Sequence, residues 1–304
     1  MQLADLTPST IARKTIPTEA ELVRAFRAPP QRLLDIGHSR VAYWRFGTGP
    51  DVVLVHGWPL DAATFRCLVP LLAPHFTCHL IDLPGVGQTK SDAGAPIDFV
   101  SHAASLKRVV DVLQLERYAL LAHDSGGFVA RLTAAEDARV TSLVLGNTEI
   151  PGHTPALVAA MALLVKVPFG VGLLKTMLRS RAVRHSALGF GGCFEDPAFL
   201  DGDFHELFIR PMLEDADVAR GQLRLLETLH AGMTDRLSEA HARIQVPVQL
   251  IWGTDDPFFP IARARRMVSG FGGPVSFEEI PGGKVFAHED HAAEFAAHAV
   301  KFLA

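Results

Sequence analysis

The hydrophobic residues of this chain form short apolar runs that alternate with longer stretches of helical spacing. Short runs rich in β-branched residues and bounded by glycine, proline or polar residues predict buried strands. The predicted strands are 32–36, 39–46, 51–55, 76–81, 118–122, 140–145, 246–252 and 275–280. Apolar residues at helical spacing predict helices over 62–72, 99–115, 125–137, 261–271 and 289–303. This alternation predicts an α/β fold with a mostly parallel central sheet of about eight strands and helices on both faces.

The alternation of strands and helices is interrupted once. Residues 151–243 contain several helical stretches and a glycine-rich loop at 189–194 but no strand pattern. We therefore predict a helical insertion at 151–243 between two parts of one core, 31–150 and 244–304. Residues 1–30 are predicted to form an N-terminal arm with one short helix over 18–27.

The stretch around Asp124 carries the strongest local signal. An apolar run ends at Ala122, a polar triplet follows, and two glycines open the next helix. The small residues Ala122 and Gly126, two positions either side of Asp124, allow a strand and a helix to approach closely around a strained turn. The amino end of the helix also favours a negative charge. This pattern predicts a nucleophile elbow with Asp124 at its tip. An ordinary strand-to-helix loop is the alternative.

Three further motifs follow other predicted strands: His-Gly-Trp-Pro at 56–59, Asp-Leu-Pro-Gly-Val-Gly at 82–87 and Trp-Gly-Thr-Asp-Asp-Pro at 252–257. With the elbow, these motifs make the chain resemble the α/β-hydrolase family from about Leu33 to its end. The resemblance implies that the insertion at 151–243 is a helical cap. The elbow sequence at 123–127 is most similar to the branch that contains haloalkane dehalogenases and epoxide hydrolases, which use an aspartate nucleophile.

The chemistry of Asp124 can be worked out independently of that resemblance. A carboxylate is ionised at neutral pH, so Asp124 needs no base to attack an sp³ carbon and form an ester. A histidine would then activate water against the ester, and a second carboxylate would orient the histidine. The backbone N–H groups of Trp58 and Ser125 are expected to form the oxyanion hole. Ser125 itself is the rival nucleophile, although His123 crowds its side of the turn.

The resemblance implies Asp256 as the orienting acid, three residues after Gly253. Its neighbour Asp255 is expected to be solvated. Glu149, after the sixth predicted strand, lies at the position that some dehalogenases of the fold use for the acid instead.

The histidine departs from the family pattern. The usual Gly-His-Phe aligns with 284–286, so Val285 stands where the base is expected. We predict that the base has moved to His288. His291, one helical turn further on, and the absence of any histidine base are the alternatives.

The predicted cap holds six phenylalanines but no tyrosine and no tryptophan, which favours an apolar pocket. The resemblance implies cap tyrosines in an epoxide hydrolase and a tryptophan after the nucleophile in a dehalogenase, and this chain has neither. Expected substrate contacts are His56, Trp58, Phe128, Phe190 and Phe194.

Composition excludes several other classes of protein. A net charge of −4 and a pI near 6.4, without a basic cluster, argue against nucleic-acid binding. Three scattered cysteines suit neither a disulfide framework nor a metal site, so we expect no metal and no cofactor. The most apolar stretch, 155–178, is broken by Lys166, Pro168 and two glycines, so no membrane span is expected.

The sequence therefore predicts a cytoplasmic hydrolase, monomeric or homodimeric, acting on a small apolar substrate through an aspartyl ester. A serine esterase or lactonase that uses Ser125 is the first alternative. A ligand-binding protein that has lost its base is the second.

Overall fold

The central sheet of the protein has the order β1-β2-β4-β3-β6-β7-β8-β9, with the short strand β5 paired to β2. The computed structural model describes residues 16–229 and 232–304. The strands are β1 Arg32–Asp35, β2 Ser39–Phe46, β3 Asp51–Val55, β4 Thr77–Ile81, β5 Lys90–Ser91, β6 Tyr118–His123, β7 Val140–Gly146, β8 Val248–Gly253 and β9 Val275–Ile280. Pairings of β2 are antiparallel, and those from β4 through β9 are parallel. The predicted α/β fold is confirmed.

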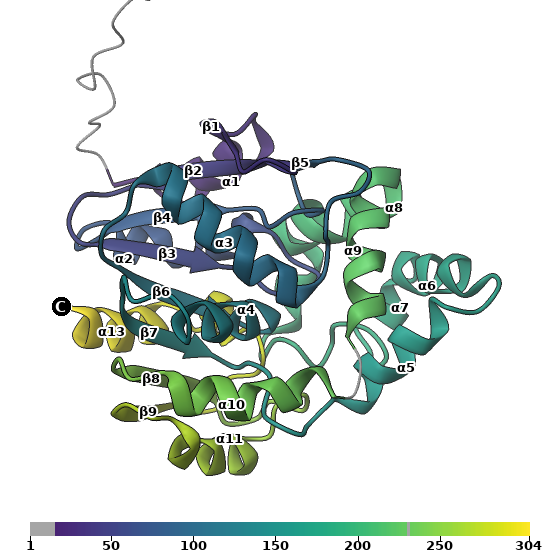
Figure 1. Ribbon diagram of the computed structural model, residues 1–304. Coiled ribbons are helices and arrows are strands. Elements are labelled where there is room, and N and C mark those ends of the chain that lie inside the picture. The colour runs from purple at the N-terminus through teal and green to yellow at the C-terminus, as the bar shows by residue number, and fades with distance from the viewer. Residues whose placement is uncertain (1–15, 230–231) are drawn as a thin grey trace, which may run out of the picture.

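Helices cover both faces of this sheet (Figure 1). In that view α3, α4 and α10 lie in front of the strands, and α2 and α13 lie behind them. The bounds are α1 Glu19–Arg27, α2 Val69–Leu72, α3 Phe99–Leu113, α4 Ser125–Ala134, α10 Arg236–Arg243, α11 Ile261–Met267, α12 Ala287–Asp290 and α13 Ala292–Leu303. Short 3₁₀ turns occur at Ala62–Arg66, Pro197–Asp201, Met233–Asp235 and Val268–Gly270, and a π turn at His205–Ile209.

The residues between β7 and β8 contain helices and no strand in the part that the structure describes. They include α5 Ala156–Leu164, α6 Gly170–Arg179, α7 Arg181–Arg184, α8 Arg210–Glu214 and α9 Ala216–Thr228. These five helices lie beyond the carboxyl ends of the parallel strands, at the right of Figure 1. In contrast, α10 packs beside α4 on the sheet. The cap boundary at residue 243 stays a prediction. Helix α10, which lies inside that boundary, packs with the core helix α4.

Two predicted helices are broken in the structure. The stretch 62–72 forms a 3₁₀ turn and then α2, because Asp61 caps the first piece and Pro70 sets the start of the second. The stretch 289–303 divides at His291 into α12 and α13. Strand β5 was not predicted, since two residues are too short to show alternation. Of the predicted N-terminal arm, residues 1–15 lie outside the described residues.

No helix among the residues described here is long and apolar enough to cross a membrane.

The closest packing of a helix on the sheet is at the start of α4. A Cβ atom at Gly126 would collide with the backbone oxygens of Val55 and His56 at the end of β3. Asp124, two residues before Gly126, has a backbone with a positive φ of 48° and a ψ of −143°. Glycine at 126 is therefore required for the turn that holds Asp124.

Gly126→Ala should lower the free energy of unfolding by about 1–3 kcal/mol, because backbone atoms of β3 cannot move aside for a methyl group. Gly94→Ala is the matched control, since a Cβ atom there meets nothing within 4 Å. Urea unfolding of both variants measures the difference. Equal midpoints would contradict the close packing of α4 on β3.

Candidate active site

Asp124 lies in the turn between β6 and α4 with its carboxylate at the predicted oxyanion hole. Its Oδ1 accepts hydrogen bonds from the backbone N–H of Trp58, at 3.0 Å, and of Ser125, at 2.5 Å. The side chain is half-buried, and burial raises its pKa while these two hydrogen bonds lower it. The structure thus brings Asp124, Trp58 and Ser125 together in the arrangement that the sequence predicts.

Ser125 is turned away from solvent. It is 1% exposed, and its Oγ accepts a hydrogen bond from the N–H of Trp58 at 2.8 Å. The indole of Trp58 is also fixed, because its Nε1 donates to the carbonyl of Gln222 on α9 at 3.0 Å. The geometry therefore favours Asp124 over Ser125 as the group that meets a substrate.

Two small cavities, of about 40 and 50 Å³, meet at Asp124. Trp58, Asp124, Val158 and Phe259 border both of them. Ser125 borders neither cavity. Since a site for one water molecule needs roughly 10–15 Å³, these cavities hold a molecule of only a few heavy atoms.

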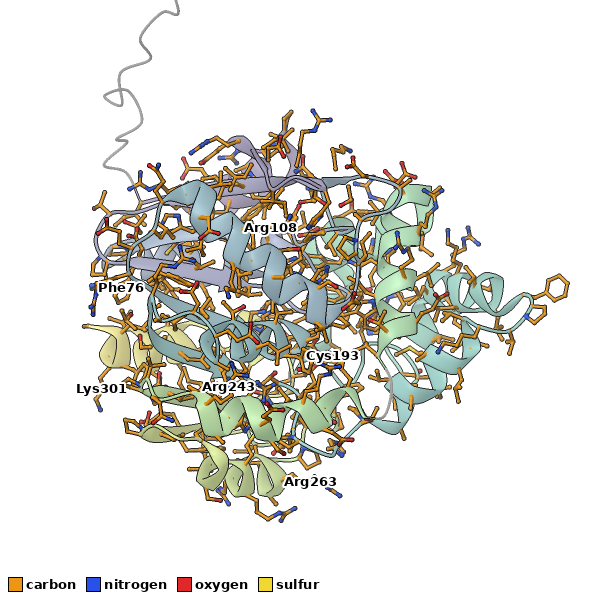
Figure 2. All side chains as sticks on the ribbon, in the orientation of Figure 1. Phe76, Arg108, Cys193, Arg243, Arg263 and Lys301 are labelled. Atoms are coloured by element: carbon orange, nitrogen blue, oxygen red, sulfur yellow. The ribbon has the colours of Figure 1, made fainter. Side chains whose placement is uncertain are left out.

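The two cavities differ in their other walls. The smaller one is also lined by Glu149, His153, Thr154, Pro155, Leu229, Met233 and Thr234. The other one is also lined by Pro59, Leu157, Met161, Gly189, Phe190, Cys193, Phe258, Val285 and Phe286. Figure 2 labels Cys193 where the helices between β7 and β8 meet the core. Burial, and then the charges of Asp256 and Asp124, raise the pKa of its thiol, so Cys193 stays protonated.

A much larger cavity, about 610 Å³, lies beyond Pro59 and does not include Asp124. The half-buried Asp61 and the buried Asp82 on its wall hold loop backbone: Asp61 accepts from the N–H of Ala63, and Asp82 accepts from those of Ala62 and Gln88. We assign these carboxylates to loop structure because most of their hydrogen bonds are to the backbone.

Of the five expected substrate contacts, Trp58 and Phe190 line the cavities at Asp124, whereas His56, Phe128 and Phe194 do not. The His56 ring joins two loops: its Nδ1 contacts the carbonyl of Gly57, and its Nε2 accepts from the N–H of Leu83, both at 3.0 Å. Burial lowers the pKa of His56 to about 4, so the ring is neutral. Phe128 is fully buried in α4, and Phe194 stacks on Phe199.

Asp256 is buried among hydrogen-bond donors from its own loop and from β7. Its Oδ1 accepts from the N–H groups of Phe258 and Phe259, and its Oδ2 accepts from the side-chain amide of Asn147 at 2.6 Å. Burial raises its pKa to about 6. In the described part of the chain no histidine is hydrogen-bonded to Asp256.

His288, the predicted base, lies in a separate buried cluster. Its Nε2 is 2.7 Å from the Thr64 hydroxyl, and its ring stacks on His123 with centroids 3.6 Å apart. Burial, together with the charge of Arg66, holds its pKa well below the usual value. Within the described residues His288 makes no hydrogen bond or ion pair with Asp124 or Asp256.

Glu289, the residue after His288, holds this cluster together. Glu289 accepts from the hydroxyl of Thr64 at 2.6 Å and pairs with Arg66 at 2.8 Å. The sequence around His288 and Glu289 therefore anchors α12 to the 3₁₀ turn at Ala62–Arg66. The apolar side chain of Val285, not a histidine, borders the cavity at Asp124. His291 pairs with Glu195 at 2.6 Å, with its side chain partly exposed.

Two polar side chains after β7 share the smaller cavity with Asp124. The sequence pattern indicates Glu149 only as an orienting acid and assigns no role to His153. Glu149 accepts from the Thr148 hydroxyl at 2.9 Å and lies 3.7 Å from the fully buried Arg131. His153 contacts the carbonyl of Phe258 through Nε2 at 2.8 Å. The sequence indicates Glu149 and His153 only by their position just after β7, because the carboxyl ends of neighbouring parallel strands meet at one edge of a sheet.

The pKa of Glu149 is raised to about 7. Burial is the largest cause, and the negative charge of Asp124 is the next, while Arg131 acts in the opposite direction. A carboxyl group with such a pKa can exchange a proton near neutral pH.

Comparison with known proteins agrees with this fold. The alpha/beta hydrolase family matches residues 52–298. The chain belongs to this family and is a hydrolase of it, as the motifs predict. Haloalkane dehalogenase 2 of Mycobacterium tuberculosis is 28% identical over 289 residues, covering 88% of this chain and 92% of that protein.

Two further relatives carry other activities. Pimeloyl-[acyl-carrier protein] methyl ester esterase of Pectobacterium atrosepticum is 27% identical over 236 residues, covering 74% of this chain and 84% of the esterase. The solved structure of the epoxide hydrolase CorEH superposes with a TM-score of 0.74 at 21% identity, covering 88% of this chain and 95% of that one. The last likeness shows the fold alone.

Thr64→Val tests whether the His288 cluster is structural. Removal of the hydroxyl leaves Nε2 of His288 and Oε1 of Glu289 without that hydrogen bond, so the free energy of unfolding should fall by about 1–3 kcal/mol. Turnover per folded molecule should stay near that of the unchanged protein. If urea unfolding shows an unchanged stability but turnover is lost, His288 takes part in the reaction and the structural assignment is wrong.

Proposed function

We propose that this hydrolase cleaves a carbon–leaving group bond in a small apolar molecule through an ester on Asp124. The observation that carries the proposal is the place of the Asp124 carboxylate. It borders both small cavities, and its Oδ1 is held by the N–H groups of Trp58 and Ser125. The rival hydroxyl of Ser125 is buried and borders neither cavity.

In the first half-reaction, a carboxylate oxygen of Asp124 attacks the sp³ carbon, and the electron pair of the broken bond leaves with the leaving group. In the second, water attacks the carbonyl carbon of the ester. The negative charge that develops on the ester oxygen is stabilised by the N–H groups of Trp58 and Ser125, and such donors contribute about 3–4 kcal/mol each in comparable sites. Collapse of this intermediate releases an alcohol and regenerates Asp124.

Glu149 is the proposed proton carrier for both half-reactions. It shares a cavity with Asp124, and Thr148 and Arg131 hold one of its oxygens. While Asp124 is charged, Glu149 retains a proton that it can donate to a leaving alkoxide. Esterification makes Asp124 neutral, which removes one cause of the raised pKa and leaves Glu149 ionised to accept a proton from water.

Small epoxides are the proposed substrates, because an opening ring produces an alkoxide that needs this proton. A short haloalkane is the second candidate, favoured by the 28% identity to a haloalkane dehalogenase over most of the chain. The indole N–H of Trp58 is already bound to Gln222, so this group is not free to hold a halide.

Asp124→Asn should lower turnover of a small epoxide by at least about a thousandfold, because the amide is not a nucleophile. The fold should be unchanged, since the two side chains are nearly isosteric. Ser125→Ala is the matched control and should keep most of the activity, because the backbone N–H of residue 125 remains. Full activity of the first variant and none of the second would transfer the reaction to Ser125.

Glu149→Gln should still form the ester but hydrolyse it about 10²–10⁴-fold more slowly, because water loses its base. With a haloalkane, whose halide leaves without a proton, intact-mass measurement should show one substrate-derived adduct on Asp124. His153→Gln and His288→Gln test the two rival bases, and neither should accumulate the adduct. Accumulation in one of these histidine variants, but not in Glu149→Gln, would assign the base to that histidine.

The pH dependence of ester hydrolysis follows from the same assignment. Glu149 must be ionised to act as the base, so the rate should be full above its pKa and fall as the pH drops through it. Since neutral Asp124 no longer raises that pKa, the midpoint should lie below about 7. Rapid-quench measurements of adduct decay test this, and a rate that rises as the pH falls would exclude Glu149 as the base.

A further inference from the structure

The connection between α5 and α6 carries a group of exposed apolar side chains. Leu163, Val167, Phe169 and Leu173, here called the apolar tip, are all more than half exposed, and Phe169 is 93% exposed. Among the described residues, the other large hydrophobic residue with more than half its surface exposed is Leu188, in the same insertion. Helix α6 lies at the right edge of the molecule in Figure 1.

The chain holds this tip in a defined turn. Phe169 has φ 64°, a left-handed backbone that a bulky side chain rarely adopts. A Cβ atom on the next residue, Gly170, would collide with the carbonyl of Leu164, so the turn closes tightly on the end of α5. The most exposed phenylalanine of the described chain is therefore presented outward by a specific backbone conformation.

The chain segment that carries the tip has charges of one sign. Residues 150–194 contain five lysines and arginines and no aspartate or glutamate, whereas the whole chain has 29 basic and 33 acidic residues. The rest of the chain therefore has 24 basic (29 − 5) against 33 acidic residues. Lys166, Lys175 and Arg179 make no ion pair with the described residues, while Arg181 pairs with Asp201. A positive, apolar surface thus projects from a protein that is negative elsewhere.

Helix α5 connects this surface with the candidate active site. Leu157, Val158 and Met161 of α5 border the cavity at Asp124. Leu163, near the end of the same helix, belongs to the tip. All nine residues of α5 are apolar, so the helix has no polar face to direct at water.

From these observations we infer that the apolar tip docks on an anionic lipid surface. Apolar side chains would enter the interface while Lys166, Lys175 and Arg179 contact lipid headgroups. A second copy of the chain fits less well, because a two-fold contact between identical tips would oppose these same positive charges. An apolar substrate dissolved in lipid would then reach the cavity along α5. The docking itself does not depend on the proposed reaction.

Co-sedimentation with vesicles tests the docking. The protein should bind vesicles of phosphatidylcholine and phosphatidylglycerol and should bind pure phosphatidylcholine vesicles at least tenfold more weakly. High salt should release it, because screening weakens the attraction. Equal binding to both vesicles, or no binding to the anionic ones, overturns the inference.

Variants locate the surface. Phe169→Ser with Leu173→Ser, and separately Lys166→Glu, should each reduce partition to the anionic vesicles at least tenfold. Val112→Ser is the matched control, since Val112 on α3 is 40% exposed and lies outside the positive segment. Hydrolysis of a water-dissolved substrate and the urea midpoint should be unchanged in all of them. If the protein is a dimer that Phe169→Ser converts to a monomer without any vesicle binding, the tip contacts a second copy and the inference is wrong.

Discussion

The contact between the first turn of α4 and the carboxyl end of β3 positions Asp124 against the oxyanion-hole N–H of Trp58 in the candidate site. Gly126 allows the helix to lie against the carbonyls of Val55 and His56, and this brings the N–H of Trp58 within 3.0 Å of the Asp124 carboxylate. The left-handed backbone of Asp124 is held from the other side, because its N–H donates to the carbonyl of Asn147 and its carbonyl accepts from Thr148. Hydrogen bonds from the ends of β3 and β7 therefore stabilise a strained residue at the end of β6.

The sequence predicts most of this frame and about half of the site. The end of a strand can be predicted from the residues around it, because an apolar run stops there at glycine or a polar residue. The sequence therefore places Asp124, Trp58 and Ser125 at the ends of neighbouring strands. The direction in which a side chain points cannot be predicted from its neighbours in the sequence. His288 is held by Thr64, which is 224 residues away in the chain, and His56 is held by Leu83. Such partners are set by packing across the sheet, and a motif spacing does not contain them.

Electrostatics gives the pair Asp124 and Glu149 a property that neither carboxylate has alone. Both line the same small cavity, where burial and the charge of Asp124 raise the pKa of Glu149 and the buried Arg131 limits that rise. Any event that neutralises Asp124 therefore favours ionisation of Glu149. In the proposed reaction, the protonation state of Glu149 is therefore coupled to the covalent state of Asp124.

Helix α5 borders the cavity at Asp124 and also carries part of the exposed apolar tip. Its sequence therefore has to suit both surfaces. Helix α5 is apolar on the side of Val158, where it borders the cavity at Asp124. A helix in water normally offsets such a face with charged residues on the opposite one, but α5 has none, and the nearest charged residue in the sequence is Lys166, just after its end. Burial in the core does not explain this composition, since only Ala162 of α5 is fully buried. An apolar exterior that remains exposed in the folded chain is stable where the surroundings are themselves apolar, and the lysines beside it favour surroundings with a negative surface.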